Sequence, residues 1–209
     1  MCLVCPARLL GGWPSLTECA GCDVELDERI SRLAAQAKQL SGMVYRSAAP
    51  QYANTADLVT GEGSWLVGGR WNPAGVAAVY GSFTPQTAME ETLAHSRYYE
   101  LPVHAAMPRT FVAIAFHLVS VLDLTDGAVR RSLRVSEKRL LECDRRAGVP
   151  AGKTPPTQQL GRAVHRAGLE GLLVPSAADL GGRNLVVFVE NLQPGSTLEV
   201  VAADRLSSA

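Results

Sequence analysis

The chain has 209 residues, of which 47% are hydrophobic and 19% are charged, a composition typical of globular proteins. Twenty basic and twenty acidic residues give a formal net charge of zero, so we expect no direct binding to nucleic acid or to an anionic membrane surface. The longest apolar run, residues 111–124, contains His117 and Asp123 and is shorter than the roughly 18 to 20 residues of a membrane span.

The first 23 residues hold four of the five cysteines, in two C-x-x-C pairs: Cys2, Cys5, Cys19 and Cys22. This segment lacks the charged and apolar regions of a secretory signal, so we expect a reducing, cytoplasmic location, which disfavours the alternative of two disulfides. Four thiolates complete a tetrahedral zinc shell. The gap of thirteen residues between the two pairs is shorter than the spacing of about 15 to 20 that is usual in zinc sites. We therefore predict a structural Zn²⁺ module over residues 1–24, with an iron–sulfur cluster or free buried thiols as alternatives.

A linking helix is predicted over residues 25–42, because apolar residues recur there at helical spacing and Ser41 and Gly42 form a stop signal. Short β-like runs and helical segments follow. The apolar run at 111–124 is interpreted as two buried strands. Residues 61–69, which match neither a P-loop nor a Rossmann glycine pattern, are interpreted as a flexible loop. Because strands and helices do not alternate strictly, we predict an α+β fold with compact mixed or antiparallel sheets and flanking helices.

One helix has a clear predicted start. The Thr84 hydroxyl can accept a free amide hydrogen of the first turn, and Pro85 occupies a position where the missing N–H costs nothing. Glu91 and His95 are four residues apart and therefore share one face of this helix. That polar face can line a cleft.

Three side chains could meet in such a cleft. Arg46, on an early strand, offers a planar fork of donors for phosphate, and Tyr80, at a strand end, offers a ring that can cover a flat cationic heterocycle. Glu91 offers a carboxylate for ribose hydroxyls or for an oxocarbenium-like centre. A ligand that carries diphosphate, ribose and a pyridinium ring is nicotinamide adenine dinucleotide (NAD). The alternative is that these residues are solvated charges and a packed ring, as in many domains.

Five motifs occur together in the chain: YRSA at 45–48, GGRWNPAG at 68–75, VYGS at 79–82, TAMEETLAH at 87–95 and VPSAADLGGRNLVVF at 174–188. In order and approximate spacing they resemble the RES-domain family, bacterial toxins named for Arg, Glu and Ser residues and paired with Xre-type antitoxins. The resemblance implies a RES domain over residues 43–205. It also implies a fold similar to diphtheria-toxin-type ADP-ribosyltransferases, and activity on NAD.

The resemblance also assigns roles to single residues. The catalytic set would be Arg46, Tyr80, Glu91 and Ser176, with Tyr80 stacked on nicotinamide and Arg46 also binding the dinucleotide. Glu90 competes with Glu91 for the carboxylate role, and the offset from Tyr80 favours Glu91. Further ligand-binding candidates are Tyr52, Arg70 and Asn184. We expect Trp71 to pack and Cys143 to be a structural thiol, while His95 either lines the site or lies in the core.

The function implied is an NAD-degrading toxin of a type II toxin–antitoxin system, which breaks the nicotinamide–ribose bond by hydrolysis or phosphorolysis. Its expected partner is an Xre-type antitoxin. One alternative is a protein ADP-ribosyltransferase, because loops outside these motifs select the acceptor. Another is a non-catalytic RES-like binding module in which the cysteine pairs recognise a partner.

Overall fold

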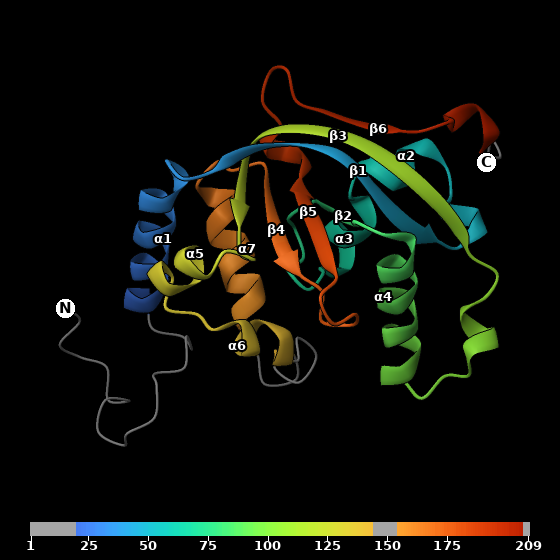
Figure 1. The fold of residues 1–209 in the computed structure, drawn as a ribbon, viewed down its shortest axis with the longest axis horizontal. Coiled ribbons are helices and arrows are strands. Elements are labelled where there is room, and N and C mark those ends of the chain that lie inside the picture. Colours follow the sequence, from blue (N-terminus) through green and yellow to red (C-terminus); the bar gives the residue numbers. More distant parts are fainter. Residues whose placement is uncertain (1–19, 144–153, 207–209) are drawn as a thin grey trace.

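The computed structural model of the protein describes residues 20–143 and 154–206 (Figure 1). Within these residues lies one six-stranded sheet with the strand order β1-β2-β5-β4-β3-β6. The strands are β1 (Lys38–Ala48), β2 (Ala78–Ser82), β3 (Thr110–Asp123), β4 (Gly171–Pro175), β5 (Arg183–Phe188) and β6 (Thr197–Val200). Only β3 and β4 pair in parallel; the other pairs are antiparallel. The predicted mixed α+β fold is thus confirmed.

Pairing of β1 with β3 closes the sheet on itself. The two long strands run side by side and curve across the molecule, with their register extending from Lys38 opposite Val121 to Ala48 opposite Thr110 (Figure 1). Together with β2, β5 and β4 they form a closed ring of pairings. Such closure requires strong twist and leaves few free strand edges.

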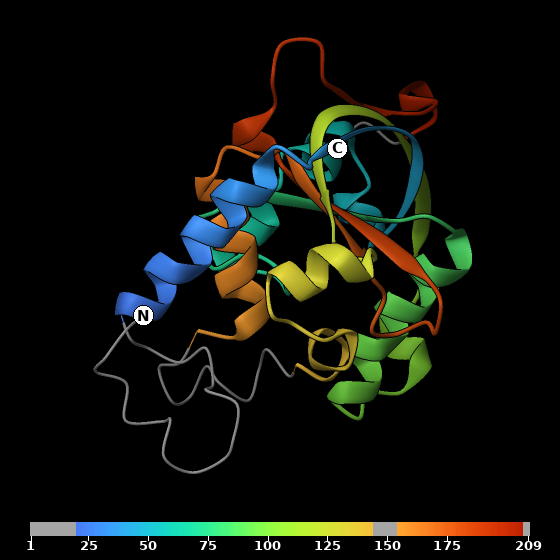
Figure 2. The ribbon, with the colours of Figure 1, turned by 60° about the vertical axis from the view of Figure 1, so that its left-hand side comes forward.

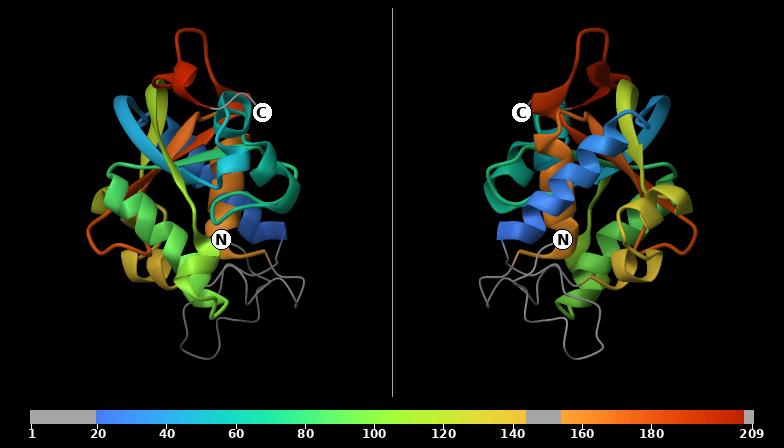
Figure 3. Two further views of the ribbon diagram at one scale, coloured as in Figure 1. Left: turned by 90° about the vertical axis from the view of Figure 1, so that its right-hand side faces the viewer. Right: turned by 90° about the vertical axis from the view of Figure 1, so that its left-hand side faces the viewer.

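Seven α-helices surround the sheet in the described ranges. They are α1 (Ala20–Ala34), α2 (Thr55–Val59), α3 (Glu62–Val67), α4 (Pro85–Tyr98), α5 (Gly127–Ser132), α6 (Glu137–Glu142) and α7 (Pro156–Arg166). The last three fall between β3 and β4, because parallel neighbours need a long crossover connection. Helix α4 stands apart from α1 and α7, near the opposite end of the molecule (Figures 1 and 3).

Both faces of the central strands are buried. On β5, Val186 and Phe188 pack into the cluster under α1 and α7, while Leu185 and Val187 pack into the second cluster, under β1 and β3. Successive side chains of a strand point to opposite faces, so a strand buried on both sides needs a continuous apolar run. The sequence LVVF at 185–188 meets that need.

Helix α1 belongs to the domain and is not a linker, so the predicted helix over 25–42 is wrong in extent and role. The helix ends at Ala34, and β1 already begins at Lys38. Its apolar face joins the main core cluster, where Ile30 is fully buried. The helix lies beside α7 (Figure 2), and Arg166 Nη2 donates to both carboxylate oxygens of Asp27, at 2.9 and 2.7 Å. Pairing of residues 38–42 with β3 overrides their helical spacing.

In two other segments the observed secondary structure differs from the prediction. The run at 111–124 forms one strand, β3, whose first part pairs with β1 and whose last part pairs with β4. Residues 61–69, predicted to be a flexible loop, contain the helix α3. Gly61 and Gly68 flank this helix with φ of 71° and 72°, a conformation that glycine adopts without a steric penalty.

The predicted zinc module falls largely outside the described residues, which exclude Cys2, Cys5 and Cys19. Cys22 falls in the first turn of α1. The zinc site therefore stays a prediction. In the ranges 20–143 and 154–206, no three His, Cys, Asp or Glu residues gather as a metal site, and no helix has the length and hydropathy to cross a bilayer.

Candidate active site

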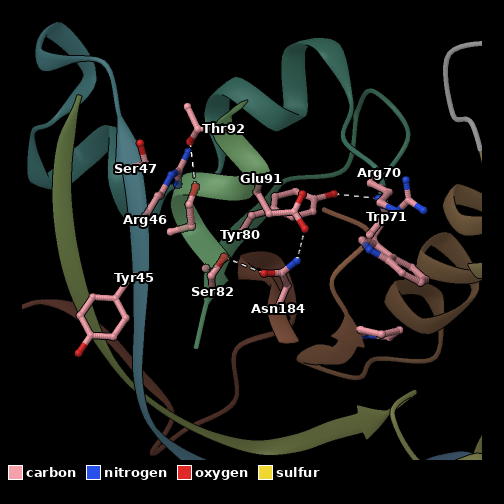
Figure 4. Close-up of a pocket in the computed structure, with 14 residues that line it drawn as sticks. Tyr45, Arg46, Ser47, Arg70, Trp71, Tyr80, Ser82, Glu91, Thr92 and Asn184 are labelled. Atoms are coloured by element: carbon pink, nitrogen blue, oxygen red, sulfur yellow. Dashed lines mark hydrogen bonds between the residues drawn. The ribbon is translucent and has the colours of Figure 1, made fainter. Parts of the chain in front are cut away.

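A cavity of about 220 Å³ opens between β1, β2, β5 and α4 (Figure 4). Residues from distant parts of the chain meet here because the sheet closes: β1 brings residues 45–47, and α4 brings Ala88, Glu91 and Thr92. The polar side chains of the lining belong to Tyr45, Arg46, Ser47, Arg70, Trp71, Tyr80, Ser82, Glu91, Thr92 and Asn184. The cavity therefore combines cations, rings and a carboxylate.

The carboxylate of Glu91 is held by two donors. Ser176 Oγ donates to its Oε1 at 2.6 Å. Asn184 Nδ2 donates to the same oxygen at 2.7 Å (Figure 4). The neighbouring Glu90 lies on another helix face, where its carboxylate pairs with Arg97 at 3.0 Å. Helical rotation of about 100° per residue separates the two glutamates, so only Glu91 lines the cavity.

The hydroxyl of Ser176, just after the end of β4, takes part in three hydrogen bonds. Ser176 is 4% exposed, and its Oγ accepts the backbone N–H groups of Ala178 at 3.2 Å and Asp179 at 3.0 Å. Its own proton goes to Glu91. The serine thus joins the loop after β4 to the carboxylate of α4.

The hydroxyl of Tyr80 is anchored by the turn that precedes β2. It donates to Asn72 Oδ1 at 2.6 Å. It also accepts from the backbone N–H of Trp71 at 2.9 Å (Figure 4). Asn72 is fully buried, and its Nδ2 donates to the carbonyls of Ser64 at 2.9 Å and Val76 at 2.7 Å. A Cβ at Gly69 would overlap the Tyr80 hydroxyl, so this turn requires glycine. The Gly-Arg-Trp-Asn turn therefore anchors the hydroxyl end of the Tyr80 ring.

Arg46 brings a partly buried cation to the cavity. Its Nη1 donates to the carbonyl of Leu58 at 2.8 Å. Burial lowers the pKa of Arg46; the negative charge of Asp57 opposes this, and the positive charge of Arg109 adds to it. A guanidinium stays protonated through such shifts, so Arg46 remains a cation that can bind an anionic group.

Comparisons with known proteins show the family and the fold of the chain. The model of the RES domain matches residues 32–207. The chain belongs to the RES domain family. Among solved structures, it is similar to a chain of the M. tuberculosis MbcT–MbcA toxin–antitoxin complex, with 24% identity, a TM-score of 0.65, and coverage of 84% of this chain and 91% of that chain. No curated protein matches the sequence. The structural likeness supports a shared fold.

In this RES domain the structure gathers most of the residues proposed from the sequence. Arg46, Arg70, Tyr80, Glu91 and Asn184 all line the cavity, whereas Ser176 reaches it through Glu91. Arg70 also donates to the carbonyls of Leu140 and Leu141, the latter at 3.0 Å, and so ties the turn to the end of α6.

Other sequence candidates lie elsewhere. Tyr52, proposed as a second site tyrosine, is 60% exposed and does not line the cavity, because the 3₁₀ turn Pro50–Tyr52 points it to solvent. Trp71 is 2% exposed and packs in the core, as expected, while its edge reaches the cavity. The backbone of His95 lies in α4. Cys143 lies outside the cavity, with its Sγ 3.6 Å from Thr157 Oγ1.

The sequence interpretation missed several lining residues of the RES site. Ser82 follows Tyr80 by two positions on the same strand, and the period of two places both on one face, which was a readable signal. Thr92 directly follows Glu91 on α4. Tyr45 also borders the cavity, although its ring points away from Glu91 (Figure 4).

Proposed function

We propose that this RES-domain protein is the toxin of a toxin–antitoxin pair and cleaves the nicotinamide–ribose bond of NAD. The observation that supports the proposal is the convergence of Arg46, Tyr80 and Glu91 on one cavity. They come from three different elements, β1, β2 and α4. Together they provide a phosphate-binding cation, an aromatic ring anchored at its hydroxyl and a carboxylate, which are the groups that this ligand requires.

In the proposed reaction the bond between ribose C1′ and nicotinamide N1 breaks. Its electron pair moves to the pyridinium nitrogen, so nicotinamide leaves as a neutral molecule. Positive charge develops on the ribose, and the carboxylate of Glu91 stabilises it electrostatically. The Tyr80 ring holds the nicotinamide and Arg46 holds the diphosphate, which together orient the scissile bond.

The acceptor completes the reaction. A water oxygen that bonds to C1′ and releases one proton gives ADP-ribose, whereas an inorganic phosphate oxygen at the same carbon gives its phosphorylated counterpart. Hydrolysis or phosphorolysis is the activity that we propose. Transfer of ADP-ribose to a protein side chain is the alternative with the same first step.

The decisive experiment mixes the purified full-length protein with NAD and measures nicotinamide by chromatography. We expect release of nicotinamide, with stimulation by inorganic phosphate if phosphate is the acceptor. The Glu91→Ala variant, shown by its melting curve to be folded, is the control for contaminating activity. Absence of nicotinamide release, with or without phosphate and bacterial lysate protein as acceptors, would contradict the proposal and favour a non-catalytic binding module.

The toxin assignment is tested in growing bacteria. The structural neighbour is part of a toxin–antitoxin complex, so we propose that an antitoxin protein, of the Xre type that the family resemblance implies, binds this chain. Induced expression should halt growth and lower cellular NAD, and the Glu91→Ala variant should do neither. Unimpaired growth with abundant, folded wild-type protein would argue against a toxin.

A further inference from the structure

A continuous line of hydrogen bonds runs through the cavity wall and links Ser82, Asn184, Glu91 and Ser176. Ser82 on β2 and Asn184 on β5 are opposite each other in the strand register. Opposite residues of an antiparallel pair have Cβ atoms about 4.5 to 5.5 Å apart and point to the same face. The Ser82 hydroxyl therefore reaches Asn184 Oδ1, at 2.7 Å, and Asn184 Nδ2 reaches Glu91 (Figure 4).

The direction of each hydrogen bond follows from the chemistry of the groups. An ionised carboxylate only accepts, so both contacts to Glu91 Oε1 are donated, one by Ser176 and one by Asn184. The amide of Asn184 must then turn its nitrogen to Glu91 and its oxygen to Ser82. That oxygen also only accepts, so the proton between Ser82 and Asn184 belongs to Ser82.

The two oxygens of Glu91 are therefore inequivalent. Oε1 receives both donors, while no group whose position the structure describes donates to Oε2. Because Glu91 lines the cavity, the oxygen without a donor is the one available to a ligand. The position of that oxygen depends on the Asn184 amide, which in turn depends on Ser82.

We infer that Ser82 is a positioning residue that acts through Asn184 to aim Oε2 of Glu91 at the ribose of the substrate. The inference rests on the proposed NAD cleavage. Ser82 is 5% exposed, so its hydroxyl contributes through this internal contact. Asn184, which the sequence suggested as a ligand-binding residue, then serves mainly to orient the carboxylate.

Kinetics of nicotinamide release separate positioning from substrate binding. Ser82→Ala removes the hydroxyl proton that holds the Asn184 side-chain oxygen. We expect kcat to fall about tenfold while KM for NAD changes by less than about twofold. Ser82→Thr keeps the hydroxyl and should recover most of kcat. Asn184→Asp keeps the shape but replaces the donor with an oxygen, and should lower kcat by at least about tenfold.

Ser96→Ala is the matched control. Ser96 is also 5% exposed and lies on α4, but it is not part of the line of hydrogen bonds. The Ser96→Ala substitution removes the same hydroxyl oxygen at the same burial as Ser82→Ala. Because Ser96 is outside the line of hydrogen bonds, kcat and KM should stay unchanged. A Ser82→Ala variant with wild-type kcat, or one impaired only in KM, would overturn the inference, as would equal losses in Ser82→Ala and Ser96→Ala.

A measurement without turnover keeps the inference distinct from the proposed function. In NMR spectra the side-chain amide protons of Asn184 should exchange with water slowly in the wild type and in Ser82→Thr. In Ser82→Ala they should exchange at least about tenfold faster, because the amide loses the partner that holds it. Unchanged exchange would refute the positioning role. A wild-type protein that releases no nicotinamide but shows this exchange pattern would refute only the NAD-cleaving function.

Discussion

Glu90 and Glu91 are adjacent in the sequence but have different surroundings. Glu91 receives hydrogen bonds from Ser176 and Asn184 at the cavity, while Glu90 forms a partly exposed ion pair with Arg97. Exposed ion pairs contribute only about 0 to 1 kcal/mol to folding stability. Loss of the Glu90 side chain should therefore cost the protein little stability. A single helical step therefore separates a proposed catalytic group from a surface charge.

Alanine substitution of each glutamate tests this difference. Glu91→Ala should lower kcat/KM for nicotinamide release by at least about a hundredfold, because the group that stabilises the transition-state charge is lost. Glu90→Ala, the matched control on the next position, should stay within about twofold of wild type. Loss of activity in Glu90→Ala with retention in Glu91→Ala would reverse the assignment.

Packing between elements places the residues of the site. Helix α7 docks against the turn that anchors Tyr80: Gln158 Nε2 donates to the Gly69 carbonyl at 2.8 Å, and a Cβ at Gly161 would overlap the Trp71 carbonyl. A helix interior normally favours alanine over glycine by about 1 kcal/mol. At Gly161, close approach of the backbone outweighs that preference.

Alanine substitutions at two helical glycines should therefore change the free energy of unfolding differently. Gly161→Ala should destabilise the protein by at least about 2 kcal/mol, because α7 must move away from the turn. Gly63→Ala in α3 should be neutral or stabilise by up to about 1 kcal/mol, since a Cβ there meets no atom within 4 Å. Urea unfolding measures both. Equal effects would show that α7 does not depend on contact with the Trp71 carbonyl.

The four N-terminal cysteines, of which Cys22 alone falls in the described residues, are expected to bind zinc. Protein purified without chelator should contain about one zinc per chain, because two C-x-x-C pairs supply a complete thiolate shell. Substitution of Cys19 and Cys22 by serine should remove the metal, whereas Cys143→Ser should not. Metal-free protein with four reactive thiols in the first 22 residues would contradict the zinc module.

Across the whole molecule, one buried carboxylate ties distant segments together. Glu170, fully buried before β4, accepts from the backbone N–H groups of Val119 at 2.6 Å and Ser120 at 2.9 Å, and from Gln193 at 2.7 Å. It also accepts from the Ser196 hydroxyl. Burial opposes ionisation, but these hydrogen bonds outweigh it and hold the pKa of Glu170 below its usual value. The ionised form thus joins β3, β4 and the turn before β6.

The stability of the protein should depend on pH through this group. Because the folded pKa of Glu170 is lowered, its stabilising contribution is present above the unfolded pKa of about 4.3 and is lost as pH falls through the folded value. Glu170→Gln should lower the free energy of unfolding at pH 7 by at least about 2 kcal/mol, since its NH₂ would face backbone donors. This deficit should shrink below about pH 4. A deficit independent of pH in urea unfolding would exclude the charged state as its cause.

Local signals allowed much of the fold to be predicted. The Thr84 hydroxyl accepts the N–H of Thr87 at 3.0 Å at the start of α4, as the sequence indicated. The β-like runs at 171–176 and 184–192 contain the strands β4 and β5, although β5 ends at Phe188. Residues 38–42 could not be assigned in this way, because their helical spacing competes with pairing to β3, a partner about eighty residues away in the sequence.

By itself the sequence determined the family, the α+β class and the polar set Arg46, Tyr80 and Glu91, since motif spacing and nearest-neighbour preferences are local properties of the chain. Only the tertiary structure decided that Tyr52 lies outside the cavity, that the Ser82 hydroxyl bonds Asn184, and that the Ser176 hydroxyl bonds Glu91. The physical reason is sheet closure: the β1–β3 and β2–β5 pairings bring together residues separated by up to about a hundred positions, and no local pattern encodes which side chains then meet.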